Sequence, residues 1–234
     1  EGKRIDEWCD SRRADVRARV SLLVQICEAL EYAHRTLVLH RDIKPSNILV
    51  TDAGQVQLLD FGVSTGLADE ADPRRTGFSQ DYTAPEVFRG ASPHVTMDVY
   101  SIGMLMYGLL AGVLPSNRMS LFGFELRGRS GNRLSWLAQS AGQDAAIARG
   151  ARDATDLGRQ LEGLDAMARR CITPNPLARY ASAAALRQDL LRWLGATPVK
   201  PKRRRDPAVP RALMPEGADS GTRKMSDEES PDES

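Results

Sequence analysis

The sequence predicts a mainly α-helical domain of the α+β type, with one small β-hairpin and a polar C-terminal segment. Two observations indicate helices: apolar residues recur every three or four positions over residues 16–34, and residues 98–111 are apolar on most sides. A third indicates the hairpin, because two short apolar runs, 48–51 and 55–59, flank a turn that contains Gly54. The chain has 234 residues, which is long enough for one well-buried core.

The N-terminal half contains three predicted elements besides the hairpin. The helix over residues 16–34 is amphipathic and starts after Asp15, which can cap it. A short strand is predicted at residues 37–39, ahead of the hairpin. Residues 98–111 are predicted to form a buried central helix, because most of the helix surface is apolar.

The C-terminal half is predicted to be helical with irregular connections. Glycines and arginines interrupt residues 118–155, so only short helical pieces are expected there, at 135–140 and 144–149. Apolar spacing then predicts two further helices, over residues 157–171 and 181–194.

The composition changes abruptly after Gly195. Residues 196–234 hold a basic run at 200–205, several prolines and a terminal cluster of serines and acidic residues. Such a sequence cannot bury enough apolar surface to offset the entropy lost on ordering. We therefore expect one folded domain over residues 1–195 and a disordered tail over residues 196–234.

Composition also argues against several classes of partner. The 32 basic side chains nearly balance the 31 acidic ones, which argues against a dedicated nucleic-acid surface. The three cysteines are widely separated, in a pattern that suits neither a disulfide framework nor a zinc site. The longest apolar stretch, 99–114, is shorter than the roughly 20 residues that a bilayer span needs. We expect a cytoplasmic protein with no membrane span and no nucleic-acid partner.

The most specific signal is a series of short motifs. Three of them follow one another in the order His40-Arg41-Asp42, Asp60-Phe61-Gly62 and Ala84-Pro85-Glu86. Lys44 and Asn47 lie two and five residues after the first aspartate. This order is typical of protein kinases. The chain therefore resembles the large C-terminal lobe of a eukaryotic-type, bacterial-like protein kinase. The lysine two residues after the aspartate is typical of the serine/threonine branch of this family.

The resemblance implies a role for each residue of this group. Asp42 and Lys44 would be catalytic: the aspartate accepts or orients the proton of the attacking hydroxyl, and the lysine neutralises charge near the γ-phosphate of ATP. Asn47 and Asp60 would bind Mg²⁺ through oxygen atoms, and Leu49 would form the floor under the adenine ring. We therefore expect ATP and Mg²⁺ as cofactors and a protein serine or threonine hydroxyl as substrate.

The resemblance also implies two structural contacts. Glu86 and Arg179 fit the buried ion pair that joins the end of the family's activation segment to the C-terminal subdomain. Asp98 would accept backbone N–H groups of the catalytic loop. The alternative for Asp98 is an ordinary helix N-cap.

Residues 60–86 correspond to the activation segment of the family. Ser79 would bridge the catalytic aspartate and lysine, and Arg41 marks a loop of the type that phosphorylation regulates. The candidate phosphosites, in order of preference, are Thr76, Thr65 and Ser64. Each of these hydroxyls has the alternative of being simply solvated.

The segment upstream of the motifs is short for this family. Only 39 residues precede His40, and they contain neither a glycine-rich phosphate loop nor the nucleotide-binding lysine. The family needs the pair formed by that lysine and a helix glutamate for activity. We therefore expect the chain to be a large lobe without its small lobe and to be inactive alone. The alternative function is a non-catalytic, kinase-like scaffold.

Overall fold

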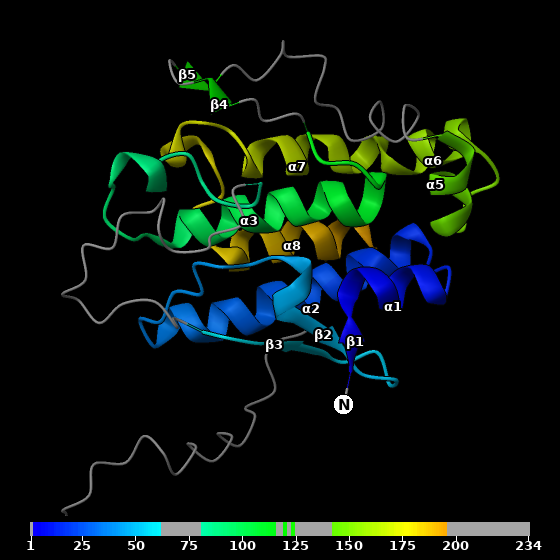
Figure 1. Cartoon of the computed structure of the whole chain (residues 1–234), viewed down its shortest axis with the longest axis horizontal. Helices are drawn as coiled ribbons and strands as arrows, with labels where there is room; N and C mark the ends of the chain where they lie inside the picture. The colour runs from blue at the N-terminus through cyan, green and yellow to red at the C-terminus, as the bar shows by residue number, and fades with distance from the viewer. Residues whose placement is uncertain (1, 62–80, 116–118, 121–122, 125–141, 196–234) are drawn as a thin grey trace, which may run out of the picture. The chain divides into compact units, whose positions relative to one another are not determined.

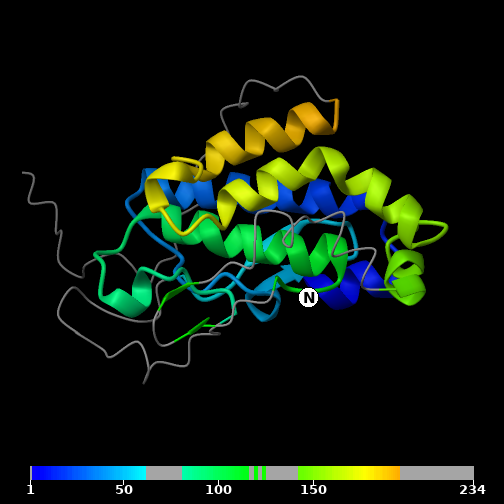
Figure 2. The same cartoon turned by 90° about the horizontal axis from the view of Figure 1, so that it is seen from above.

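Helix α3 (Val95–Met106) runs through the middle of the folded part and is buried along almost its whole length (Figure 1). The computed structural model describes residues 2–61, 81–115, 119–120, 123–124 and 142–195. Helix α7 (Asp165–Cys171) packs along one side of α3. On the other side lie α2 (Val16–Arg35) and α8 (Ala183–Trp193), which pack against each other (Figures 1 and 2). The helices predicted at 16–34 and 181–194 are thus confirmed.

Helix α2 is capped at its start and buries the apolar residues that recur along its sequence. The Asp15 side chain accepts a hydrogen bond from the Ala18 amide and caps the helix, as predicted. Its apolar stripe faces the core, with the buried residues Val16, Val20, Leu23, Ile26, Cys27 and Leu30. No helix in the described part of the chain is long and apolar enough to cross a membrane.

A small antiparallel sheet lies beside α2 and contains the predicted hairpin. Strand β2 (Ile48–Val50) pairs with β3 (Val56–Leu58), and Ile48 lies opposite Leu58. The amide of Gln25, on α2, bonds to both ends of the turn: it donates to the Gly54 carbonyl and accepts from the Val56 amide. The long helix therefore fixes the position of the hairpin.

Two short elements precede α2. Strand β1 (Lys3–Arg4) adds to the free edge of β2, so that the sheet order is β1-β2-β3. Helix α1 (Ile5–Ser11) follows it directly and buries Ile5 and Cys9. Strand β1 was not predicted, because it is too short for its sequence pattern to indicate it. Helix α1 was expected, because the start of the chain resembles a helix of the kinase family.

The strand predicted at residues 37–39 is wrong. Leu37 has a φ of 61°, in the left-handed region, which ends a helix and does not continue into a strand. The Leu37 amide donates to the His34 carbonyl, and the Val38 amide donates to the Ala33 carbonyl. These hydrogen bonds terminate α2 and use the amides that a strand would need.

The central helix is longer than predicted and ends in an unusual turn. It begins at Val95 and passes into a π-helical turn, η3 (Tyr107–Ala111). Two buried arginines, Arg19 and Arg149, both donate to the carbonyl of Leu109 in this turn. Burial lowers the pKa of Arg149 to about 10, and the nearby Arg19 charge adds to the effect. The two guanidinium groups satisfy carbonyls that a helix end would otherwise leave without partners.

The helix predicted over residues 157–171 is interrupted. It consists of α6 (Ala154–Leu161), a 3-10 turn η4 (Glu162–Leu164) and α7. The indole of Trp193 lies over Gly163, where a Cβ atom would come within 2.8 Å of its Nε1. The absence of a side chain at Gly163 therefore makes room for Trp193 of the last helix.

Of the remaining predicted segments, the structure describes one and leaves the others outside the described residues. The helical piece predicted at 144–149 corresponds to α5 (Gly142–Ala148). The piece predicted at 135–140 lies outside the described residues, as does the tail after residue 195. The domain boundary at residue 195 therefore stays a prediction. Two short strands that were not predicted, β4 (Met119–Ser120) and β5 (Gly123–Phe124), pair with each other.

The crossing of α3 and α7 gives a first testable prediction. A Cβ atom on Gly103 would lie 2.5 Å from Cβ of Cys171 and 2.7 Å from Cγ2 of Ile172. We expect Gly103→Ala to lower the free energy of unfolding by about 1 to 3 kcal/mol through overpacking, as measured by urea denaturation. Gly108→Ala is the control, because its Cβ would meet only ordinary contacts at 3.6 Å or more. Equal effects of the two substitutions would contradict the close approach of α3 and α7.

Candidate active site

The candidate site is formed by the two loops that lie at the ends of the hairpin. The first loop leads from α2 to a short 3-10 turn, η1 (Pro45–Asn47), and then to β2. The second loop follows β3. The Leu59 amide donates to the Asn47 carbonyl at 2.9 Å and joins the two loops. This bond brings Asp60 close to the end of the first loop.

Asp42 is held by two neighbours through one of its oxygens. Nζ of Lys44 lies 2.8 Å from Asp42 Oδ2, and Nδ2 of Asn47 donates to the same oxygen at 2.8 Å. Asn47 Nδ2 also donates to the Asp42 main-chain carbonyl. Within the described residues, Oδ1 of Asp42 has no such partner, and the side chain is about a third exposed. One carboxylate oxygen is therefore fixed, and the other can accept a proton.

Asp60 lies on the second loop in a backbone conformation that side chains rarely adopt. Its φ is 56°, and its side chain is exposed. The next residue, Phe61, packs its ring against the imidazole of His40, with 4.8 Å between the ring centroids. This contact joins the second loop to the first.

The oxygen atoms of Asn47 and Asp60 fit a magnesium ion chemically. The Asn47 amide nitrogen donates to Asp42, and its oxygen, which accepts only a long bond of 3.5 Å from the Ser46 hydroxyl among the described residues, is the atom that can bind a cation. A carboxylate and an amide oxygen are the hard ligands that Mg²⁺ takes, with the remaining positions left to phosphate and water. The chemistry of these two side chains agrees with the predicted metal role, which no contact in the structure tests.

Leu49 lies on the face of the sheet that does not enter the helical core. Its neighbours Ile48 and Val50 are fully buried, whereas Leu49 is only partly buried. Alternation along a strand therefore directs Leu49 away from the core. This orientation is compatible with the predicted contact to the adenine ring, which stays a prediction.

Asp98 connects the first loop to the central helix. It is 1% exposed, and it accepts hydrogen bonds from the main-chain amides of His40 and Arg41 at 3.0 Å and 2.8 Å. The predicted contact with the catalytic loop is confirmed. The N-cap of α3 is His94, so the alternative role for Asp98 is wrong.

His40 gives the site a dependence on pH. Burial lowers the pKa of its imidazole, and the nearby carboxylates of Asp98 and Asp42 oppose this effect only in part. A histidine whose pKa is lower in the folded state stabilises the fold above its ordinary value of 6.5, and this stability is lost as the pH falls.

We therefore expect the free energy of unfolding to decrease as the pH falls below about 6.5. The comparison is urea denaturation at neutral pH and at mildly acidic pH, for the wild type and for His40→Phe. The variant retains a ring that can pack against Phe61, but it cannot bind a proton. Its stability should decline less on acidification. Equal declines in the two proteins would show that His40 is not the titrating group.

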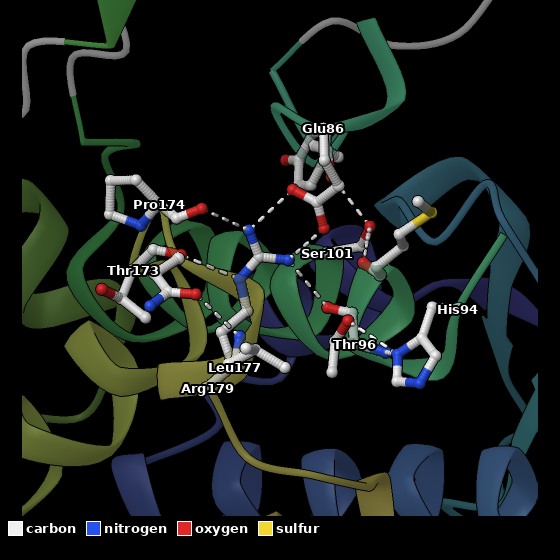
Figure 3. A network of polar contacts seen from close by, with 11 residues as sticks. Glu86, His94, Thr96, Ser101, Thr173, Pro174, Leu177 and Arg179 are labelled. Atoms are coloured by element: carbon white, nitrogen blue, oxygen red, sulfur yellow. Dashed lines mark hydrogen bonds and ion pairs between the residues drawn. The ribbon is translucent and has the colours of Figure 1, made fainter. Parts of the chain in front are cut away.

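Arg179 forms the second predicted contact, the ion pair with Glu86 (Figure 3). Its Nη1 donates to Glu86 Oε1 at 2.5 Å, and its Nη2 donates to Glu86 Oε2 at 2.8 Å. Three carbonyls accept its remaining N–H groups, those of Thr96, Thr173 and Pro174. Both side chains are buried, so the predicted ion pair is confirmed. The ion pair fixes the segment that begins at residue 81, after the undescribed residues 62–80, against α3 and the C-terminal helices.

Sequence reasoning missed some contacts of the site and placed others in the undescribed part. The contact of His34 with Asp98 was not predicted, because 64 positions separate the two residues and no local pattern marks it. The predicted bridging and phosphorylated hydroxyls lie outside the described residues, namely Ser79, Thr76, Thr65 and Ser64.

Comparison with known proteins identifies the family. The protein kinase domain family matches residues 4–191, and the chain belongs to this family. Serine/threonine-protein kinase PknB of Mycobacterium leprae is 29% identical over 191 residues, which cover 78% of this chain and 27% of PknB. Serine/threonine-protein kinase PknK of Mycobacterium bovis is 45% identical over 108 residues, which cover 45% of this chain and 10% of PknK.

A solved structure shows the same fold. The kinase domain of PknI from Mycobacterium tuberculosis, crystallised as a double mutant, matches with a TM-score of 0.56 at 21% identity. The match covers 82% of this chain and 62% of that domain. The chain thus has the fold of a protein kinase, is homologous to serine/threonine kinases and spans about a quarter of the length of PknB. Members of this family use ATP and Mg²⁺.

Proposed function

We propose that the full-length protein carrying this chain transfers the γ-phosphate of ATP to serine or threonine hydroxyls of other proteins. The observation that carries the proposal is the arrangement around Asp42. Lys44 and Asn47 hold one carboxylate oxygen at 2.8 Å each, and no described residue binds the other oxygen, which can accept from a substrate. The names of the relatives PknB and PknK, both serine/threonine-protein kinases, support the choice of substrate class.

The residues of the loop suit the steps of this reaction. The substrate hydroxyl loses its proton to Asp42 as its oxygen bonds to the γ-phosphorus, while the bond from that phosphorus to the ADP oxygen breaks. Lys44 places a positive charge beside the reacting groups and stabilises the charge that develops on the phosphoryl oxygens. Asn47 and Asp60 would hold Mg²⁺ through their side-chain oxygens, and the ion would supply positive charge that offsets the phosphate charge.

The buried contact between Asp98 and the loop also favours catalysis over a scaffold role. Asp98, which is 1% exposed, accepts hydrogen bonds from the two amides that precede Asp42 in the loop. A scaffold would not need an ordered carboxylate with one oxygen that no described residue binds. The cytoplasmic location and the absence of nucleic-acid partners stay predictions.

The test is transfer of labelled phosphate from ATP to a generic protein substrate by the full-length protein with Mg²⁺. Acid hydrolysis of the product should release labelled phosphoserine or phosphothreonine. The matched control omits Mg²⁺ and adds a chelator, which should abolish the label. Absence of transfer in the presence of Mg²⁺, from a protein that binds ATP, would contradict the proposal and favour the scaffold function.

A further inference from the structure

The side chain of Gln25 binds the outer edge of the sheet that carries the candidate site. Gln25 lies on α2 and is partly buried. Its Nε2 donates to the Gly54 carbonyl at 3.0 Å, and its Oε1 accepts from the Val56 amide at 3.1 Å. One side chain thus holds both the end of the hairpin turn and the first residue of β3.

This amide takes the place that a further strand would occupy. In the described part of the chain, β3 pairs with β2 on one side, and no strand pairs with its other edge. The free edge of a strand presents N–H and C=O groups that need partners. A glutamine amide has the same kinds of donor and acceptor as a peptide group. Gln25 therefore completes this part of the edge and ties β3 to the long helix.

The two proposed metal ligands lie at the open end of the same hairpin. Asn47 directly precedes β2, and Asp60 lies two residues after the end of β3. Both strands have three residues, and so short a hairpin is marginally stable on its own. Contacts from outside the hairpin therefore decide where β3 lies, and the position of β3 decides where Asp60 lies.

We propose that Gln25 is a positioning residue, which holds β3 against α2 and thereby sets the place of Asp60 relative to Asn47. The proposal rests on the proposed function, because it concerns the side chains that would hold Mg²⁺ with ATP. A role in stability alone would act differently. It would lower the amount of folded protein and the maximal rate, but it would leave the half-saturating Mg²⁺ concentration unchanged.

The test is the Mg²⁺ dependence of phosphate transfer by the full-length protein with Gln25→Met. Methionine has a similar length, but it has no N–H group to donate and its sulfur is a weak acceptor. Both bonds to the hairpin should therefore be lost. We expect the half-saturating Mg²⁺ concentration to rise by about three- to tenfold, since groups that orient a metal ligand tune the affinity for the metal.

A double variant tests whether Gln25 acts through Asp60. Once Asp60→Asn has removed the charged ligand, its exact position matters less. Gln25→Met should then raise the half-saturating Mg²⁺ concentration little further, because two residues that act through one group do not have additive effects. The same fold increase with and without Asp60→Asn would overturn the proposal.

A further readout does not depend on activity. Hydrogen exchange, measured by mass spectrometry on peptides that span residues 54–60, should be faster in Gln25→Met than in the wild type, because the Val56 amide loses its acceptor. If no version of the protein, wild type included, transfers phosphate but the exchange rates differ in this way, the proposed function fails and the positioning of β3 by Gln25 stands.

Glu31→Gln is the matched control on the same helix. Its ion pair with Arg187 joins α2 to α8 rather than to the hairpin. It should change neither the Mg²⁺ requirement nor the exchange of residues 54–60. If Gln25→Met does not fold, Gln25→Asn replaces it, because its amide is one carbon shorter and should not reach β3. A wild-type Mg²⁺ requirement and wild-type exchange in the Gln25 variant would overturn the proposal, as would equal changes in Glu31→Gln.

Discussion

Replacing Asp42 with asparagine in the full-length protein should lower kcat by about a hundredfold or more, while the KM for ATP changes only a few-fold. Asparagine has one oxygen, which can keep the bonds from Lys44 and Asn47 that Oδ2 accepts in the wild type. The loop should therefore keep its shape. The second oxygen becomes an NH₂ group, which cannot accept the hydroxyl proton.

The control for this substitution is Asp52→Asn, which makes the same chemical change in the hairpin turn. Asp52 is 94% exposed and forms one ion pair with Arg12, so its loss should leave kcat unchanged. The measurement is the initial rate of phosphate transfer at saturating ATP. A rate for Asp42→Asn within a few-fold of the wild type would remove Asp42 from its catalytic role.

The second large effect is expected from Arg179→Met, which should lower the free energy of unfolding by about 3 to 5 kcal/mol. Methionine fills much of the space but donates no hydrogen bond. The Glu86 carboxylate would remain buried without its partner, and the carbonyls of Thr96 and Thr173 would lose their donor. The uncompensated buried charge is the main part of the cost.

Three further variants separate the ion pair from general packing: Glu86→Met, the double variant and Arg187→Met. Removing both charges, with Arg179→Met and Glu86→Met together, should cost less than the sum of the two single substitutions, because no lone charge remains. Arg187→Met breaks the more exposed pair with Glu31 and should cost less than about 1 kcal/mol. Urea denaturation measures all four proteins. Additive losses at Arg179 and Glu86 would contradict a coupled buried pair.

The fold was predictable where a local pattern decides the structure. The apolar period of α2 follows from residues that contact the core every three or four positions, and Asp15 caps it as its side chain chemistry implies. The hairpin follows from a turn that contains Gly54, at a φ of 74°. In each case the residues that determine the element lie within the element itself.

The errors had both local and distant causes. Residues 37–39 are apolar like a strand, but the amides of Leu37 and Val38 complete the end of α2. The helix predicted over 157–171 is interrupted where Trp193, from the last helix, packs over Gly163. Strand β1 forms only because the edge of β2 is there to pair with it. The last two contacts lie outside any local pattern.

The residues of the site were predictable from the sequence, whereas the contacts that hold the catalytic loop were predictable only in part. The motif order indicated Asp42, Lys44, Asn47 and Asp60, and the structure brings the first three together within hydrogen-bonding distance. The contact of Asp98 with the loop was also predicted. The bond from His34 could not be, since it links helices far apart in the sequence.

The measurement that tests the site most directly is the Mg²⁺ dependence of phosphate transfer in the wild type and in Asp60→Asn. Asp60 is exposed on the loop joined to Asn47, and its carboxylate is the only charged group of the proposed pair of metal ligands. If the two side chains bind the ion that ATP requires, Asp60→Asn should need roughly tenfold or more Mg²⁺ to reach half of its maximal rate. The same half-saturating Mg²⁺ concentration and the same maximal rate in both proteins would contradict the assignment of this site.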